Sequence, residues 1–319
     1  MIMKTINYSE IKEALHGFDL FICSSSFEER CLGVSKHLNI EKFQNFVICH
    51  FSYNYPEADK NLAELKNIFD NQSIVVELGQ NTPLANYDKL YDTLDKDTYT
   101  NVLLDISTFT REIFLMILQL FRQESFITKN LTLCYNPSDK YSSVSNNELD
   151  KLWLSKGVQN IRAVLGYSGD FSPIKKSMLI VLVGFEAERA EILIDSYEPS
   201  ILFIGKAKKE ESKNDELAKI NDINFKKLQK LNPNAEKFDF SCIDLSPTIN
   251  SINQIVEKYR QEYNIVISPM SNKLSTLAVA SVVFKYPEVQ ICYAATNLYN
   301  VNAYSTPSEH IHVIDANDL

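Results

Sequence analysis

A short turn rich in hydroxyl groups is the segment of this chain best suited to hold an anion. It begins at Asp105, offers the hydroxyls of Ser107, Thr108 and Thr110, and ends on the cation Arg111. The turn separates an apolar run from a helical pattern, so its polar groups are expected beside a helix N-terminus. Hydroxyl groups and a guanidinium in that place can bind a phosphate. The alternative is structural, with a hydroxyl capping the helix and Arg111 paired with a nearby carboxylate.

A second turn of the same design occurs in the other half of the chain. It spans residues 268–273, where Pro269 fixes the turn and Ser271, Asn272 and Lys273 supply polar contacts. It also lies between an apolar run and a helical pattern. Two such turns in corresponding places favour anion binding over helix capping alone.

A basic residue also follows the first strand of each half. The sequences Phe-Glu-Glu-Arg and Phe-Glu-Ala-Glu-Arg end at Arg30 and Arg189. A cation near a helix N-terminus is unfavourable unless it meets an anion. That anion is either a ligand or an internal carboxylate such as Glu28 or Glu186. We include Glu186 among the candidate ligand contacts, together with Ser25 in the serine-rich turn that precedes Arg30.

A Cys-Tyr pair ends an apolar strand in each half, at Tyr135 and at Tyr293. Six residues after each comes a second tyrosine, Tyr141 or Tyr299, in a loop. These aromatic rings could stack on a base, although tyrosine is also a common strand residue. Asn297 in the second loop is a candidate for hydrogen bonds to a base or a ribose. Asn136, Asp139 and Thr296 are further candidates of the same kind.

Several well-known catalytic and binding signatures are missing from the sequence. It has no GxGxxG, no GxxxxGK[ST], no GxSxG and no HExxH, and only 8 glycines. The five histidines form no cluster with cysteine, so we predict no metal site and no cofactor. Asp105 is the leading candidate for a catalytic base, with Glu28 and Glu186 as the alternatives, and whether the protein is an enzyme remains open.

The bulk composition limits the classes of partner. With 319 residues the chain can form two domains, and a net charge of -9 argues against binding along an extended nucleic acid. The six cysteines form no CxxC pair and mostly lie in apolar runs, as buried thiols of a reducing compartment do. We see no signal peptide and no apolar run of about 20 residues. We therefore expect a cytoplasmic protein without membrane contact.

Short apolar strands alternate with helical patterns along both halves. In the first half the predicted strands are 19–23, 46–51, 73–78, 101–105 and 131–135, with helices at 8–16, 32–38, 57–69, from 82, and 111–121. In the second half the predicted strands are 178–183, 201–204, 237–242, 264–268, 289–293 and 310–314, with helices after 184, over 206–231 and from 246. This alternation predicts mainly parallel sheets with helices on both faces.

The fold class is therefore α/β, with two tandem Rossmann-like domains related by an internal pseudo-two-fold duplication. The predicted domains are 1–168 and 175–319, joined by the Gly-, Ser- and Pro-rich stretch 166–173; a single large sheet is the alternative. Ligands bind beyond the carboxyl ends of such strands. The copies align Arg30 with Arg189, Arg111 with Lys273, Tyr141 with Tyr299, and Asp105 with Ile267.

The two polar turns resemble the ligand loops of the CARF superfamily, the CRISPR-associated Rossmann-fold sensor domains. The resemblance lies in the Ser/Thr turn with a basic residue opening the next helix, at 105–111 and again at 268–273. It implies a tandem copy that binds a cyclic oligonucleotide in the cleft between the two halves, as a monomeric pseudo-dimer or a homodimer. The chain differs from that family in lacking glycines in its first turn and in lacking a recognisable effector.

Three functions remain open at this point. The first is nucleotide sensing in bacterial antiviral defence or signalling. The second is a nucleotide-processing enzyme, either a cyclic-nucleotide phosphodiesterase or a nucleotide or nucleoside hydrolase. The third is a scaffold subunit for a co-encoded effector protein, docked through the charged stretch 206–230.

Overall fold

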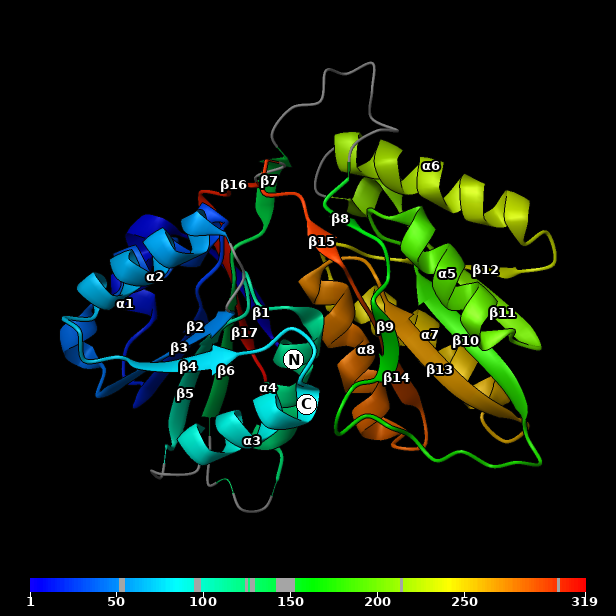
Figure 1. Ribbon diagram of the computed structural model, residues 1–319, viewed down its shortest axis with the longest axis horizontal. Coiled ribbons are helices and arrows are strands. Elements are labelled where there is room, and N and C mark those ends of the chain that lie inside the picture. Colours follow the sequence, from blue (N-terminus) through cyan, green and yellow to red (C-terminus); the bar gives the residue numbers. More distant parts are fainter. Residues whose placement is uncertain are drawn as a thin grey trace. The chain divides into compact units, whose positions relative to one another are not determined.

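The computed structural model of the chain forms two compact units (Figure 1). Unit 1 comprises Met1–Ser142 and Tyr304–Leu319, and unit 2 comprises Ser143–Ala303. The structure describes residues 1–51, 55–94, 99–123, 126, 130–141, 153–212, 215–302 and 305–319, and the side chains of 140 and 141 lie outside that description. Within these residues, no helix is both long and apolar enough to cross a bilayer.

Unit 1 contains a seven-stranded sheet. Its strands follow one another across the sheet in the order β1-β17-β6-β5-β2-β3-β4. They are β1 (Met3–Asn7), β17 (His310–Asp315), β6 (Asn130–Tyr135), β5 (Asn101–Asp105), β2 (Leu20–Ser24), β3 (Asn45–Phe51) and β4 (Ile74–Leu78). The strands from β6 to β4 are parallel, and β17 runs antiparallel to both β6 and β1.

Unit 2 contains a six-stranded sheet of the same design, in the order β12-β11-β10-β13-β14-β9. The strands are β12 (Glu236–Phe240), β11 (Ile201–Ala207), β10 (Lys176–Leu182), β13 (Tyr263–Pro269), β14 (Gln290–Ala295) and β9 (Asn160–Ala163). Its first five strands are parallel, and β9 is antiparallel to β14. The predicted pair of mainly parallel sheets is thus confirmed.

Each unit also has a small two-stranded sheet next to its main one. In unit 1, β7 (Ser138–Tyr141) pairs with β16 (Ser305–Pro307). In unit 2, β15 (Leu298–Tyr299) pairs with β8 (Ser155–Lys156).

Helices follow most of the parallel strands. They are α1 (Ile11–Ala14), α2 (Pro56–Ile68), α3 (Pro83–Leu94), α4 (Arg111–Phe121), α5 (Ala187–Tyr197), α6 (Asp215–Leu231), α7 (Leu245–Tyr259) and α8 (Lys273–Lys285). In unit 2, α5 packs with α6 and α7 packs with α8. Helix α4 is buried on almost every side, as its apolar sequence predicts.

The chain departs from the predicted helix over 32–38 in unit 1. Instead of one helix over 32–38 it forms three short 3-10 turns, Glu29–Leu32, Ser35–His37 and Ile40–Lys42. Leu32, Val34 and Leu38 are nevertheless buried, so the apolar pattern reflects packing and not helical periodicity.

The units also divide the chain differently from the predicted boundaries, 1–168 and 175–319. Strands β8 and β9 lie before the second group of parallel strands and belong to unit 2, whereas β16 and β17 end the chain and belong to unit 1. The reason is strand pairing, since β17 pairs with β6 and β9 pairs with β14. We call β8–β9 tail 1 and β16–β17 tail 2.

Candidate functional site

The loops predicted to bind a ligand flank the topological switch point of each sheet. In unit 1 the chain passes from β2 outward to β3 and β4, and then returns to β5 on the other side of β2. Unit 2 repeats this path, with β10 followed by β11 and β12 and then by β13. Open α/β sheets bind ligands beyond the carboxyl ends of the strands at this point.

A buried carboxyl group anchors the turn after β5. Asp105 is 2% exposed, and its Oδ1 accepts hydrogen bonds from the backbone N–H and the hydroxyl of Ser107, at 3.0 and 2.5 Å. Burial raises the pKa of Asp105 to about 6, although the Ser107 hydrogen bonds and nearby Arg30 oppose that rise. Asp105 therefore shapes the turn from within the protein.

The rest of this turn connects the two loops at the switch point and opens α4. The hydroxyl of Thr108 donates to the carbonyl oxygen of Ser24, at the end of β2, over 2.9 Å. Thr110 caps α4, with its hydroxyl accepting from the N–H of Ile113 at 3.3 Å. Arg111 is the first helical residue and is half-buried.

The turn after β13 is built in the same way. Asn272 caps α8 by accepting from the N–H of Ser275 at 2.9 Å, and its Nδ2 donates to the carbonyl oxygen of Cys242 at 2.6 Å. The hydroxyl of Ser271 lies 3.6 Å from the sulfur of Cys242. Lys273, in the place of Arg111, begins the helix and is half-buried.

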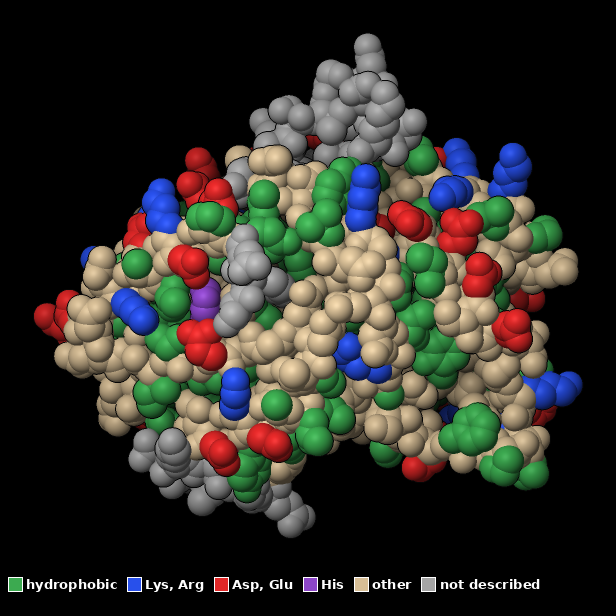
Figure 2. Space-filling view, in the orientation of Figure 1, with side chains coloured by type: hydrophobic (Ala, Val, Ile, Leu, Met, Phe, Trp, Pro, Cys, Tyr) green, Lys and Arg blue, Asp and Glu red, His purple; other side chains and the backbone are tan. Residues whose placement is uncertain are grey.

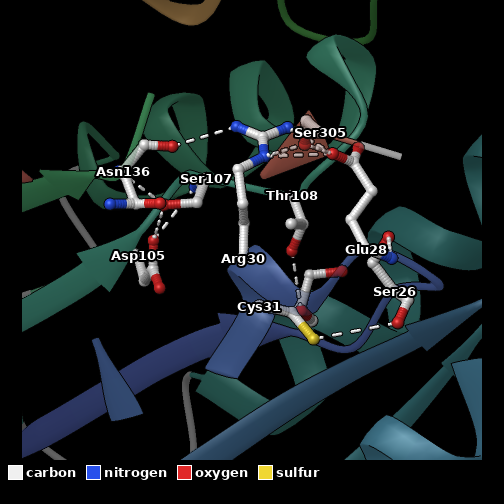
Figure 3. Close-up of polar contacts among 10 residues, drawn as sticks. Ser26, Glu28, Arg30, Cys31, Asp105, Ser107, Thr108, Asn136 and Ser305 are labelled. Carbon is white, nitrogen blue, oxygen red and sulfur yellow. Dashed lines mark hydrogen bonds and ion pairs between the residues drawn. The ribbon is translucent and has the colours of Figure 1, made fainter. Parts of the chain in front are cut away.

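Arg30 has internal partners in unit 1 (Figure 3). It is 7% exposed; its Nε donates to the hydroxyl of Ser305 at 2.6 Å and its Nη1 to the carbonyl oxygen of Asn136 at 2.9 Å. Its Nη2 forms an ion pair with Glu28 at 2.8 Å, and Ser305 also donates to that carboxylate. Arg30 thus joins the loop after β2, the end of β6 and tail 2.

Arg189 has the same kinds of partner in unit 2. It is 5% exposed, and its guanidinium donates to the hydroxyl of Ser155 at 2.9 Å and to the carbonyl oxygen of Ala294. Glu186 lies 3.8 Å from Nη1 and accepts from the N–H of Ser155 at 3.0 Å. Unlike Arg30, Arg189 has a buried Nε that finds no hydrogen-bond partner among the residues that the structure describes. We call Glu28–Arg30–Ser305 and Glu186–Arg189–Ser155 the two braces.

Two residues considered for base recognition instead hold the tails. Asn136 is fully buried, and its Nδ2 donates to the carbonyl oxygens of Ser308 and His310 at 2.9 and 3.0 Å. Thr296 is 1% exposed, and its hydroxyl donates to the carbonyl oxygen of Lys156 at 2.9 Å. Their polar groups therefore face the chain itself.

Ser25 lies at the switch point with a histidine beside it. Its hydroxyl and His50 Nδ1 are hydrogen-bonded at 2.7 Å, and His50 Nε2 lies 3.5 Å from a carboxylate oxygen of Asp59. Ser25 and His50 are each 4% exposed, whereas the Asp59 side chain is 69% exposed. In a hydrolase triad the carboxylate is buried and the serine meets the substrate, so this inverted order favours a structural role.

The remaining predicted contacts lie in the loops after β14 and β6. Asn297 is exposed and Tyr299 is half-buried in β15. The backbone of Tyr141 pairs with Ser305, and its side chain lies outside the described residues.

The strand registers correct one pairing of the two halves. Asp105 lies opposite Cys134 across β5 and β6, and Ile267 lies opposite Ile291 across β13 and β14. The residue in the place of Asp105 is therefore Ser268, whose hydroxyl donates to the carbonyl oxygen of Cys292 at 3.3 Å. The two turns still differ at this position, where unit 1 has the carboxyl group of Asp105 and unit 2 has the hydroxyl of Ser268.

The serines of both tails are not among the residues predicted from the sequence, although a signal for them exists. Ser155 and Ser305 each precede a buried or half-buried isoleucine, Ile161 or Ile311, by six residues. Searching for repeats outside the parallel strands would have found this spacing.

Comparison with known proteins places the chain near no established family. No protein-family model and no curated protein sequence matches it. A Type III CRISPR defence DNA nuclease activated by cyclic oligoadenylate is similar to it in structure, with a TM-score of 0.49 and 8% identity. That match covers 82% of this chain and 62% of the nuclease, so the chain spans less than two thirds of that protein.

A second solved structure, the cytoplasmic domain of a prokaryotic cation chloride cotransporter, matches with a TM-score of 0.25 and 8% identity. The match covers 89% of this chain and 98% of that domain. Both likenesses are too distant to indicate a function for this chain.

Proposed function

We propose that this chain binds a nucleotide at the switch points of its two sheets, and that it acts as a sensor of such a ligand. The observation that carries the proposal is the repeated helix start at each switch point. A capping side chain, Thr110 or Asn272, is followed at once by a half-buried cation, Arg111 or Lys273. Backbone N–H groups, a helix dipole and a cation together favour a phosphate group.

The finer form of the proposal is a cyclic oligonucleotide as the ligand, in bacterial defence or signalling. Its support is the duplication itself, because two equivalent sets of loops in one chain suit a ligand that repeats its phosphate and ribose. The distribution of charge on the surface also agrees with a small ligand. On the face drawn in Figure 2, acidic and basic side chains are interspersed, and the net charge of the chain is -9.

Binding is better supported than catalysis. Asp105, the candidate base, is fully enclosed and bonded to Ser107, so it does not face a substrate. Arg30 and Arg189 are held by the braces, and the proposal assigns the ligand to the cations that begin α4 and α8, Arg111 and Lys273.

Thermal unfolding of the full-length protein with defined nucleotides tests the proposal. The probes are inorganic phosphate, adenosine monophosphate, cyclic dinucleotides and cyclic oligoadenylates. A ligand that binds only the folded state raises the Tm in proportion to its saturation of the site. Failure of every probe at millimolar concentration to raise the Tm would overturn the proposal.

Variants then locate the site. Arg111→Ala and Lys273→Ala should each weaken the affinity of the active probe by about 10-fold, the loss expected for one charge-assisted contact. Lys285→Ala is the matched control, since Lys285 lies in the last turn of α8 and pairs with Glu257. Equal affinity in all three variants would exclude the switch points as the site.

A further inference from the structure

The two tails are exchanged between the two repeats. Along the chain, the parallel strands of unit 1 are followed by tail 1, and those of unit 2 are followed by tail 2. Each tail pairs with the strands that it does not follow, because β9 of tail 1 joins β14 and β17 of tail 2 joins β6. We call the strands β2–β7 core 1 and the strands β10–β15 core 2.

The tails are equivalent in sequence as well as in place. Ser155 and Ser305 begin them, and the same spacing without gaps aligns Ile161 with Ile311 and Arg162 with His312. Ile311 is fully buried in the hydrophobic core of unit 1, and Ile161 packs against that of unit 2.

Each core receives its tail through the same contacts. Ser305 lies opposite Tyr141 and Ser155 lies opposite Tyr299 in the small sheets. In the main sheets, His312 lies opposite Tyr135 and Arg162 opposite Tyr293, with the ring of Tyr135 6.0 Å from that of His312 and the Arg162 guanidinium 5.9 Å from the ring of Tyr293. Both braces end on a tail serine.

From this reciprocity we infer that the chain is a covalently joined form of a strand-exchanged dimer, and that a second copy of the chain can take part in the same exchange. In that assembly, tail 2 of each copy completes core 1 of the other. The inference goes beyond the proposed ligand and does not depend on it.

The physical argument rests on what core 1 recognises. Without tail 2, β6 would be an open edge, β1 would lose its pairing with β17, and the cavity left by Ile311 and Ile314 would be unfilled. The contacts that close this gap are the same whichever chain supplies the tail. A dimer in which each copy gives its tail 2 to the other keeps all the contacts between tail 2 and core 1. The protein concentration during folding therefore decides whether the monomer or the exchanged dimer forms.

A cysteine in tail 2 reports which chain supplies it. Val313 is the register partner of Cys134, and both side chains contact the same hydrophobic cluster. Register partners in antiparallel strands have Cα atoms about 4.5–5.5 Å apart, within the range for a disulfide. Oxidation of full-length Val313→Cys should therefore join residues 134 and 313 within a monomer, or between two chains in an exchanged dimer.

The experiment refolds Val313→Cys from denaturant at about 1 µM and about 100 µM, oxidises it, and separates the products on a non-reducing denaturing gel. We expect cross-linked monomer at the lower concentration, and a ratio of covalent dimer to monomer that is about 100-fold greater at the higher one, because exchange is second order. Dimers that persist after dilution would support the exchange, because tail 2 must unfold before it can leave core 1 of the other copy.

Two controls separate exchange from random collision. Glu309→Cys places the thiol at an exposed position of the tail, between β16 and β17, and it should give no more covalent dimer than the parent chain. In a second measurement, equal amounts of unlabelled and isotopically labelled parent chain are refolded together at the higher concentration. Native mass spectrometry then shows whether the products are monomers or dimers. Monomers alone in that mixture, or no 134–313 cross-link at either concentration, would overturn the inference.

Discussion

Arg30 and Arg189 hold equivalent positions in the two units and bind the same three kinds of group. Each contacts a glutamate in its own loop, a carbonyl oxygen just beyond a Cys-Tyr pair, and a serine of the tail. The carbonyl groups belong to Asn136 and Ala294, both one residue beyond the tyrosine. The arginines therefore fasten each tail to its core, the internal role that the sequence left open.

Removing the first arginine should destabilise the protein strongly. Arg30→Met leaves Glu28, the Asn136 carbonyl and Ser305 without their shared donor, and we expect a loss of about 3 kcal/mol in the free energy of unfolding. Urea unfolding measures it. Arg189→Met should cost less, because the ion pair of Arg189 is longer, at 3.8 Å, and its Nε has no partner within the described part of the chain. The double variant Glu28→Gln, Arg30→Met should recover part of the loss, and strict additivity would contradict a direct coupling.

Asp105 should make stability depend on pH below neutrality. Its pKa is raised from 3.8 to about 6 in the folded protein, chiefly by burial, so the folded state holds the proton more tightly than the unfolded state. The contribution of Asp105 to the free energy of unfolding is therefore greatest below pH 3.8, falls between pH 3.8 and about pH 6, and is level above about pH 6. The total loss of stability across this range is on the order of 3 kcal/mol.

Asp105→Asn should remove this dependence. Relative to the parent, the variant gains stability as pH rises from about 4 to about 6, as measured by denaturant midpoints across that range. Ser107→Ala serves as the control, because losing a hydrogen bond that lowers the pKa of Asp105 should move the decline to higher pH. A constant difference between Asp105→Asn and the parent at every pH would contradict the assignment.

The caps at the two switch points should contribute unequally to stability. Thr110→Ala removes only the bond to Ile113 N–H and should cost about 1 kcal/mol, whereas Thr110→Ser should be close to neutral. Asn272→Ala also removes the bond to the Cys242 carbonyl oxygen, so we expect a cost of about 2 kcal/mol. Thermal unfolding monitored by circular dichroism compares the three variants, and equal losses for both alanines would be the contrary result.

Cys242 should react first with a thiol reagent in the native protein. The other five cysteines are buried, and burial raises the pKa of Cys31 to about 12 and of Cys292 to about 11. Burial raises the pKa of Cys242 as well, but its side chain is partly exposed. Cys242→Ser should therefore slow the first labelling event by about 10-fold or more, and unchanged kinetics would contradict this order.

The parallel strands and most helices could be predicted because local pattern decides them. Helix α4 begins at Arg111 and ends at Phe121, as predicted, since a cap precedes an apolar run that must be buried. The Cys-Tyr strand ends, which are buried except for the half-buried Tyr293, likewise revealed the repeat. The polar turns were found for the same reason, as each is a continuous stretch between a strand and a helix.

The tails and braces could not be predicted, because they depend on partners distant in sequence. Ser305 meets Arg30 across 275 residues, and nothing near Ser305 indicates a buried guanidinium. Strand β9 is short and only half-buried, so its composition carries no strong strand signal. Asn136 misled the interpretation because an amide suited to a base is equally suited to two backbone carbonyls.

Because β17 lies between β1 and β6, its position in the chain decides which unit has all its strands first during translation. Tail 1 emerges before core 2, so unit 2 has all its strands as soon as β15 has left the exit tunnel. Unit 1 starts earlier, yet its opening strand β1 waits for β17, which is translated after all the strands of unit 2. Nascent chains usually complete their domains from the N-terminus onward. In this protein the second unit is completed first, and core 1 remains open until β17 has been translated.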